Sequence, residues 1–314
     1  HLYVLKRLIA IVPVLIGLTV IVFCIMALIP GDPATAILGS YATPENVAKL
    51  NRDLGLDRSL PEQYFIWLGN MFQGDFGRSY SLNRPVIDEV LERFSATLIL
   101  AGAALVLCTV WGLLIGIWTA ARQYGWTDKI LTFTVLVGIS VPSFWLGLLL
   151  ILLFSVELRW LPASGMYAIY GGGDLPDLLR HLAMPAVTLS VVATGVIARL
   201  TRSAMLEVLR QDFIRTARAK GVPESRVLYR HAFKAALVSV IPIIGVQAGF
   251  VLGGAVYIET VFQWPGVGRM LVQAISTRDI LLVQGGVVVV AGSYVLFNLL
   301  ADLAQSWLDP RVKS

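Results

Sequence analysis

Charged residues are scarce in this sequence. Of its 314 residues only 14% are charged, whereas 57% are hydrophobic. Soluble globular proteins carry roughly a quarter charged residues. A chain this apolar has too little polar surface to enclose its core in water, so it needs the lipid bilayer as a second apolar solvent. The composition therefore excludes an ordinary soluble protein and fits one membrane domain with water-exposed loops.

Sequence motifs of catalysis and metal binding are also missing. There is no Gly-x-x-x-x-Gly-Lys-Ser/Thr, which argues against a P-loop ATP site. There is no His-Glu-x-x-His and no Gly-x-Ser-x-Gly, so neither a zinc protease nor a serine hydrolase is indicated. The three histidines, His1, His181 and His231, are too scattered for a metal site. Cys24 and Cys108 lie in apolar runs and are expected to be small buried side chains. We expect no catalytic residue, metal or cofactor in this chain.

Long apolar runs are what the sequence has instead. A helix needs roughly 20 apolar residues to span a bilayer. The fourth run is the shortest, and it could begin at Leu178, because only Arg180 and His181 interrupt the residues before it. The first run is followed by Pro30 and Gly31 rather than by a cleavage site, so it reads as a retained signal anchor. The sequence predicts six transmembrane helices: Leu8–Ile29, Thr97–Ala121, Ile130–Ser155, Ala183–Ile197, Leu237–Ile258 and Leu281–Leu303.

Lysine and arginine set the expected orientation. If the N-terminus is cytoplasmic, the cytoplasmic segments hold more of these residues than the outer ones, as the positive-inside rule requires. An even number of spans then places the C-terminus in the cytoplasm as well. The net charge of +5 is explained by this topology, so no nucleic-acid partner is expected.

A polar segment, residues 31–94, follows the first span and is predicted to be a helical extracytoplasmic insert. Helices are expected from Pro44, from Leu60 and over Pro85–Phe94, since each begins with proline and an amphipathic stripe. These helices either pack against the spans or form a docking surface for a soluble partner, and both readings stay open. We divide the chain into residues 1–94, a membrane core of residues 95–306 and a cytoplasmic tail of residues 307–314.

Several single residues stand out within the spans and outer loops. Gly112 and Gly116, like Gly245, Gly249 and Gly253, recur every four residues and favour close packing within the chain over a subunit interface. Asp302 is an ionisable residue inside the sixth span, where it either serves gating or the pathway or makes a buried hydrogen bond. Aromatic residues of the outer loops are either interface anchors or contacts for a partner: Trp160, Tyr167, Tyr170 and Trp264.

The longest cytoplasmic piece, residues 199–235, joins the fourth and fifth spans. Gly221-Val222-Pro223 is a strong helix breaker, so one helix should end near Lys220 and another should begin at Pro223 or Glu224. Small residues at 217, 219 and 221 make sense if another protein packs closely there. The alternative is an ordinary basic loop.

The order of residues favours the first reading. Asp212 to Gly221, Asp-Phe-Ile-Arg-Thr-Ala-Arg-Ala-Lys-Gly, resembles the EAA loop of ABC importer permeases, with Arg215-Thr216-Ala217 in place of Glu-Ala-Ala. The remaining motifs resemble the dipeptide/oligopeptide/nickel permease family nearly from end to end. They are Pro30-Gly31-Asp32-Pro33, Leu54-Gly55-Leu56-Asp57, Gly74-Asp75-Phe76-Gly77, Ser140-Val141-Pro142-Ser143-Phe144-Trp145, Trp160-Leu161-Pro162, Glu259-Thr260-Val261-Phe262, Trp264-Pro265-Gly266 and Asp309-Pro310-Arg311.

This resemblance implies an all-α, type I ABC importer permease fold in a bacterial inner membrane. It implies that the loop forms a coupling helix that sits in a groove of a cytoplasmic ATPase. The implied partners are a second homologous permease in a heterodimer, two ATPase subunits that bind ATP and Mg, a periplasmic or lipid-anchored solute-binding protein, and membrane lipid. The residues implied in coupling are Asp212, Arg215, Thr216, Ala217, Arg218, Ala219, Lys220, Gly221 and Glu224.

The substrate is less defined than the role. Di- or oligopeptides are the leading expectation from the family's breadth, and nickel chelates, glutathione or opine-like compounds are the alternatives. A self-contained secondary transporter would favour several intramembrane ionisable residues and an inverted repeat. Only Asp302 is present and no repeat is visible. An intramembrane hydrolase would need a paired motif that is absent. We therefore expect a transport subunit that is not itself an enzyme.

Overall fold

The computed structural model describes the backbone of residues 2–28, 33–53 and 55–308. These residues are mostly helical, and the β-structure among them is an isolated antiparallel bridge between Arg78 and Pro85. The all-α class is confirmed. Most of the predicted tail, residues 309–314, lies outside the described residues.

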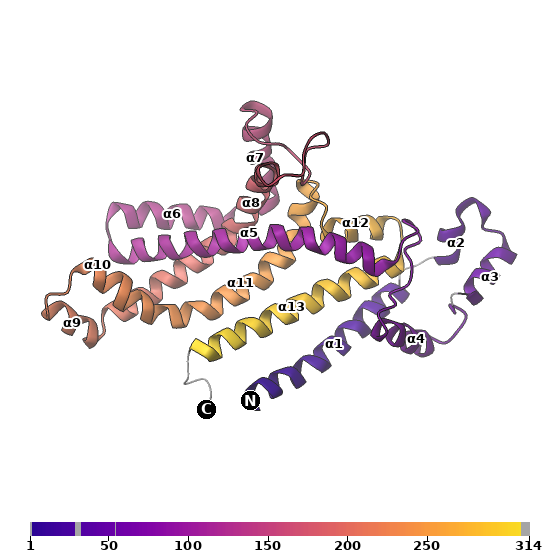
Figure 1. Ribbon diagram of the computed structural model, residues 1–314, viewed down its shortest axis with the longest axis horizontal. Helices are drawn as coiled ribbons and strands as arrows, with labels where there is room; N and C mark the ends of the chain where they lie inside the picture. Colours follow the sequence, from indigo (N-terminus) through magenta and orange to yellow (C-terminus); the bar gives the residue numbers. More distant parts are fainter. Residues whose placement is uncertain (1, 29–32, 54, 309–314) are drawn as a thin grey trace. The chain divides into compact units, whose positions relative to one another are not determined.

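The first of two compact units contains residues 1–96 and 266–295. Its helices are α1 (Leu2–Leu28), α2 (Pro33–Leu38), α3 (Pro44–Asp53), α4 (Leu60–Phe72), the start of α5 (Val86–Ala121), α12 (Val267–Ser276) and the first half of α13 (Ile280–Leu308), as labelled in Figure 1.

The second unit contains residues 97–265 and 296–314. It holds the rest of α5 and of α13, together with α6 (Trp126–Ser140), α7 (Ser143–Leu150), a π-helical segment (Ile151–Glu157), α8 (Leu175–Leu209), α9 (Asp212–Ala219), α10 (Glu224–Arg226), a second π-helical segment (Val227–Ala232) and α11 (Phe233–Val261).

Four helical runs are long and apolar enough to cross a membrane: Val86–Ala121, Leu175–Leu209, Glu224–Val261 and Ile280–Leu300. A fifth candidate is α6 together with Ser143–Glu157. Helix α1 runs over 27 residues, and its stretch with described side chains, Val12–Leu28, is also apolar. The described residues thus supply four or five spans, and the predicted number of six stays a prediction.

The third span is not the straight helix that its apolar run suggested. The chain bends by 103° between α6 and the following helix. Proline lacks a backbone N–H and disfavours helical geometry in the residue before it. Val141, which precedes Pro142, accordingly has extended angles of φ −80° and ψ 127°. One apolar run is therefore split into two helices.

The fourth span is far longer than Ala183–Ile197. Helix α8 has 35 residues and begins at Leu175, where the Asp174 side chain caps it by accepting a 2.9 Å hydrogen bond from the Asp177 N–H. His181 does not interrupt the helix, because its Nδ1 lies 2.9 Å from the Asp177 carbonyl oxygen. A local partner thus lets a polar residue stay buried in this helix.

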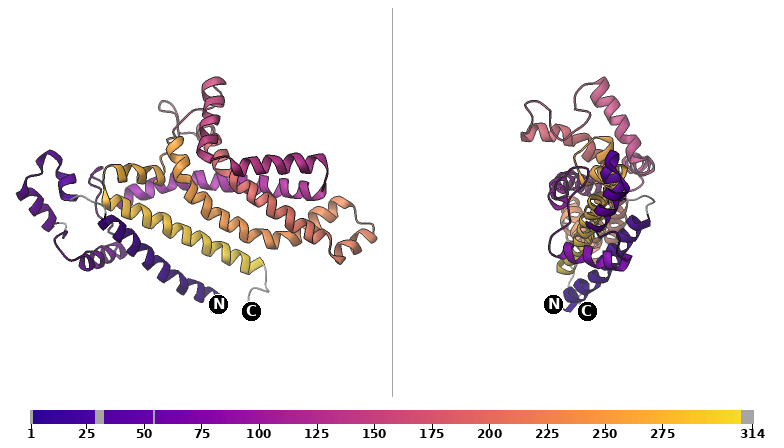
Figure 2. Two further views of the ribbon diagram at one scale, coloured as in Figure 1. Left: turned by 180° about the vertical axis from the view of Figure 1, so that it is seen from behind. Right: turned by 90° about the vertical axis from the view of Figure 1, so that its right-hand side faces the viewer.

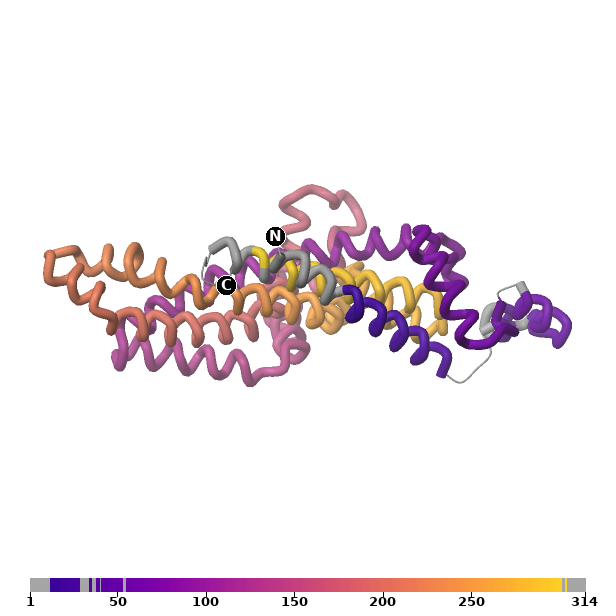
Figure 3. The backbone as a smooth tube through the Cα atoms, turned by 90° about the horizontal axis from the view of Figure 1, so that it is seen from below, coloured from indigo at the N-terminus to yellow at the C-terminus, as the bar shows by residue number. Residues whose placement is uncertain are grey.

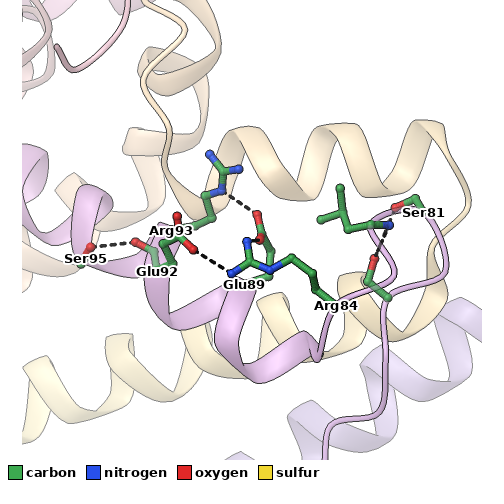
Figure 4. Close-up of polar contacts among 8 residues, drawn as sticks. Ser81, Arg84, Glu89, Glu92, Arg93 and Ser95 are labelled. Atoms are coloured by element: carbon green, nitrogen blue, oxygen red, sulfur yellow. Dashed lines mark hydrogen bonds and ion pairs between the residues drawn. The ribbon is translucent and has the colours of Figure 1, made fainter.

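The predicted short helix Pro85–Phe94 is instead the beginning of α5, which continues without a break to Ala121. Figure 4 shows how its charged first turns are satisfied. Glu89 is buried, and its two oxygens accept hydrogen bonds from Arg84 at 2.8 Å and from Arg93 at 2.7 Å. Because the buried charge is paired on both oxygens, polar residues can extend the apolar helix.

Part of the insert packs on the first helix of its own unit. The Tyr64 hydroxyl of α4 lies 3.0 Å from Thr19 Oγ1 of α1, and the Phe23 ring lies 5.5 Å from the Tyr64 ring. Phe65 and Phe72 of α4 remain exposed. The packing interpretation therefore holds for one side of α4, while docking through its other side stays a prediction.

Asp279 organises another polar contact in the first unit. The carboxylate is buried, and its Oδ2 accepts hydrogen bonds from Ser79 Oγ at 2.6 Å, Ser81 N at 3.0 Å and Ser81 Oγ at 2.8 Å. Its Oδ1 accepts from Leu282 N at 3.2 Å and so caps the start of α13. Burial, and secondarily the nearby Asp279 charge, raise the pKa of Tyr80 to about 12, which keeps this phenol neutral beside the carboxylate.

The second unit is built around α8, which contacts α6, α7 and α11. Figures 2 and 3 show α8 and α11 as neighbouring helices that lead to and from α9. Glycines allow α5 to approach α8 closely, as predicted. A Cβ atom on Gly116 would lie 2.5 Å from Thr201 Cβ, and one on Gly112 would lie 2.7 Å from Ile197 Cβ. Gly253 of the other predicted stripe has no such neighbour within 4 Å.

We expect Gly116→Ala to destabilise the protein by about 1–3 kcal/mol, because the added methyl group overpacks the α5–α8 contact. Gly102→Ala in the same helix is the matched control, since a Cβ there meets nothing within 4 Å. Because alanine has a better helix propensity than glycine, Gly102→Ala should leave the free energy of unfolding unchanged or raise it by up to about 1 kcal/mol. Thermal unfolding in detergent measures both. An equal loss of thermal stability in Gly116→Ala and Gly102→Ala would contradict the packing argument.

We expect Asp279→Ala to lower the free energy of unfolding by about 1–3 kcal/mol, because the hydrogen-bond donors around the carboxylate lose their acceptor. The start of α13 should also become less ordered, since it loses its cap. Asp279→Asn keeps one acceptor oxygen and should cost less. The midpoint of thermal unfolding, followed by tryptophan fluorescence, compares the two. An alanine variant as stable as the wild type would show that the buried carboxylate does not hold these segments.

Candidate functional site

The candidate site is the connection between α8 and α11. Helix α9 begins after extended Gln211 and ends at Ala219, with Lys220 as its C-cap. Gly221 follows with φ +75°, a left-handed conformation that only glycine adopts at little cost. The predicted helix end near Lys220 and the new start at Glu224 are confirmed.

One face of α9 is fixed to the protein. Ile214 is fully buried, and Ala217 and Val222 pack around the same apolar group. We call this group the anchoring cluster; its buried members are Ile117, Ala120, Met205, Val208, Ile214, Val227, Ala232 and Ala236. Because they come from α5, α8, α9, the π-helical segment Val227–Ala232 and α11, the short helix moves only if its neighbours move or the cluster opens.

The opposite face of α9 is exposed. It carries the candidates Asp212, Arg215, Thr216 and Ala219, together with Phe213, and the candidate Lys220, which caps the helix, is exposed as well. Ala217, by contrast, is half-buried against the anchoring cluster and faces inward. Of the three small residues expected to allow close packing by another protein, Ala219 and Gly221 are thus the accessible ones.

Phe213 is a feature that sequence reasoning missed. Its side chain is 44% exposed, beside fully buried Ile214. Two adjacent large apolar residues at a helix start cannot both point to one core, and that was the available signal. An exposed aromatic ring on a water-facing helix is suited to contact another protein.

A salt bridge closes the turn after α9. Arg218 donates to both oxygens of Glu224, from Nε at 3.1 Å and from Nη2 at 2.6 Å. This hydrogen-bonded pairing raises the pKa of Arg218. The guanidinium of Arg218, one of the residues implied in coupling, is therefore engaged within the loop, and its coupling role stays a prediction. Asp212 and Arg215 lie 3.6 Å apart and are well exposed, so their attraction is weak.

The other candidate residues lie elsewhere. Trp160, Tyr167 and Tyr170 are exposed, Tyr170 to 92%. Trp264 is fully buried at 0% exposure, so its side chain cannot contact a docking protein in this conformation. Asp302 belongs to α13, but its side chain is outside the part of the structure that is described. Its gating role stays a prediction.

Close relatives cover almost the whole chain. A dipeptide transport system permease protein of Alkalihalophilus pseudofirmus is 41% identical, over 99% of this chain and 99% of the relative. A putative peptide transport system permease protein of Brucella abortus is 43% identical over 99% and 98% of the two chains. A glutathione transport system permease protein of Pectobacterium atrosepticum is 39% identical over 99% and 98%.

Solved structures agree on the fold. A chain of the inward-facing MetNI methionine ABC transporter aligns with a TM-score of 0.59 and 17% identity, over 70% of this chain and 96% of that one. At such low identity the similarity concerns the fold alone. The family described as the inner membrane component of binding-protein-dependent transport systems matches residues 112–314, and its N-terminal counterpart matches residues 1–101. With the family resemblance of the sequence thereby confirmed, this chain belongs to the inner membrane components of binding-protein-dependent transport systems.

Proposed function

We propose that this chain is a permease subunit of an ATP-driven importer, with α9 as the helix that couples it to an ATPase. The observation that carries the proposal is the two-sided character of α9. Ile214 anchors one face in the protein, while Phe213 and Ala219 lie exposed on the rest. A helix held on one side and accessible on the other transmits a force applied by a partner to α8 and α11.

The partners follow from this arrangement and from the family. Two ATPase subunits would bind ATP and Mg in the cytoplasm and contact α9 of this chain and its equivalent in a second permease. A solute-binding protein would deliver substrate from the outside, and exposed Trp160, Tyr167 and Tyr170 are candidates for its contact. Both chain termini and α9 then lie in the cytoplasm, consistent with the basic residues of this loop.

Di- or oligopeptides are the proposed substrates. Two of the relatives described above carry dipeptide or peptide transport in their names, and the third is named for glutathione, itself a tripeptide. Short peptides are the chemical class that these three share. Glutathione is therefore the second candidate, ahead of nickel chelates and opine-like compounds.

Ala219→Arg tests the coupling role. The side chain is exposed, so arginine fits the folded chain but blocks close approach by an ATPase. Gly221 is less suitable for this substitution, because its φ of +75° would add backbone strain to the effect of any bulky side chain. Loss of about 1.4 kcal/mol of docking free energy weakens the affinity for the ATPase roughly tenfold. We expect peptide-stimulated ATP hydrolysis and uptake to fall at least that far in proteoliposomes containing all subunits.

Ala121→Arg is the matched control, since it adds the same charge at an exposed alanine at the end of α5. It should leave both activities near those of the wild type. If Ala219→Arg also changes nothing, or if the purified chain alone moves peptide without ATPases, the coupling role is refuted. A self-contained transporter would then be the better description.

A further inference from the structure

An ion pair between half-buried Arg202 and buried Asp128 joins α6 to α8. Asp128, in the first turn of α6, is 5% exposed. Its Oδ1 accepts a hydrogen bond from Arg202 Nε at 3.0 Å, and its Oδ2 accepts one from Arg202 Nη2 at 2.9 Å. This side-by-side geometry fixes the two groups in direction as well as in distance.

Asp128 also holds the loop between α5 and α6. Its Oδ2 accepts from Tyr124 N at 3.0 Å, and its Oδ1 accepts from Thr132 Oγ1 at 3.2 Å. Tyr124 has φ +66°, an unfavourable conformation for a residue with a side chain. One carboxylate thus connects a strained turn, α6 and α8, and losing Arg202 would leave the buried charge of Asp128 uncompensated.

Arg202 lies close to the candidate coupling site. From Arg202 to the end of α8 at Leu209 is two turns, or about 10 Å of helix. Within this stretch Met205 and Val208 belong to the anchoring cluster that holds Ile214 of α9. The last turns of α8 are therefore attached to α9 on one side and to α6 on the other.

The apolar contacts between α6 and α8 do not fix direction in the same way. A Cβ on Gly138 would lie 2.9 Å from Val191 Cγ1, and one on Gly195 would lie 2.5 Å from Ile139 Cγ1. These contacts set how closely the helices approach, but apolar attraction is non-directional. Beyond them, the break at Val141-Pro142 separates α6 from α7. The ion pair is the directional link between α8 and the helix that leads to this break.

We propose that Arg202 and Asp128 are positioning residues that make α6 move together with α8 when an ATPase displaces α9. Neither residue contacts substrate or ATP in this scheme. The inference rests on the proposed function, since it needs α9 to be the point where force enters. Without the pair, α8 would slide against α6, and movement of α9 would be passed on incompletely.

The test uses the complete transporter in proteoliposomes, with Arg202→Gln, Asp128→Asn and the double variant. The readout is peptide taken up per ATP hydrolysed, which a merely structural role would not change. We expect each single variant to lower this ratio about fivefold or more, the lower end of typical allosteric coupling. The double variant should be no worse than the singles, because all three remove the same link.

Arg199→Gln is the matched control. Arg199 lies in the same helix and carries the same charge, but it is exposed, and the described hydrogen bonds of Asp128 are to Arg202, Tyr124 and Thr132. Its ratio should equal that of the wild type. Arg202→Lys keeps the charge and loses the two-pronged contact, so an intermediate ratio is expected. If the other variants fail to assemble, the ratio measured for Arg202→Lys alone still tests the inference.

An unchanged ratio in Arg202→Lys and in every assembled variant would overturn the inference and leave the pair a structural contact only. The proposed function is tested separately by Ala219→Arg. If that variant uncouples transport and the Arg202 variants do not, only the link between α6 and α8 is lost. If Ala219→Arg has no effect, the proposed function itself fails.

Discussion

The packing of α8 is the constraint on which the second unit depends. Of the apolar window of α8, 67% is buried within the chain, against 33% for the helical run that contains α11. Glycines of α5 and α6 remove the side chains that would otherwise keep these helices away from α8. A helix so enclosed cannot bend independently, because a close-packed interior does not yield to small displacements. Its last turns lead directly into α9.

Sequence reasoning succeeded where a signal is local. The ends of α9 follow from Gly221-Val222-Pro223, because backbone chemistry alone dictates a break there. The all-α membrane class follows from long apolar runs. Family membership rests on motifs in a fixed order. None of these conclusions required knowledge of which residues meet in space.

Sequence reasoning failed where a polar residue has a hydrogen-bond partner that the hydropathy pattern does not reveal. Arg180 and His181 looked like the boundary of the fourth span, but His181 has a partner one turn away and the helix continues through it. Glu89 looked like part of a short surface helix, but two arginines neutralise it at the start of α5. Hydropathy records that a residue is polar and says nothing of its hydrogen-bond partner. At Pro142 the error was of the other kind: a continuous apolar run predicted one span, whereas the chain bends there between two helices.

The site shows the same limit. Which of Phe213 and Ile214 points inward depends on the direction from which α8 and α11 arrive, so composition could not decide it. Arg202 and Asp128 are 74 residues apart, and nothing in the pattern around either predicts that they meet. Trp264 resembled an exposed interface anchor and is buried instead.

A coupling element has to be stiff in itself and accessible on one surface. In α9 stiffness arises from contacts made entirely within the second unit: Ile214 in the anchoring cluster, and the Arg218–Glu224 pair across the turn at Gly221. Because these side chains already have partners within the chain, no contact has to be broken when another protein binds. The entropy cost of ordering α9 is then not added to the free energy of binding. What remains exposed, Phe213 and Ala219 among charged neighbours, is available to the partner. The division between the two faces, rather than the basic charge of the loop, is the observation that favours the proposed coupling role over an ordinary loop beside the membrane.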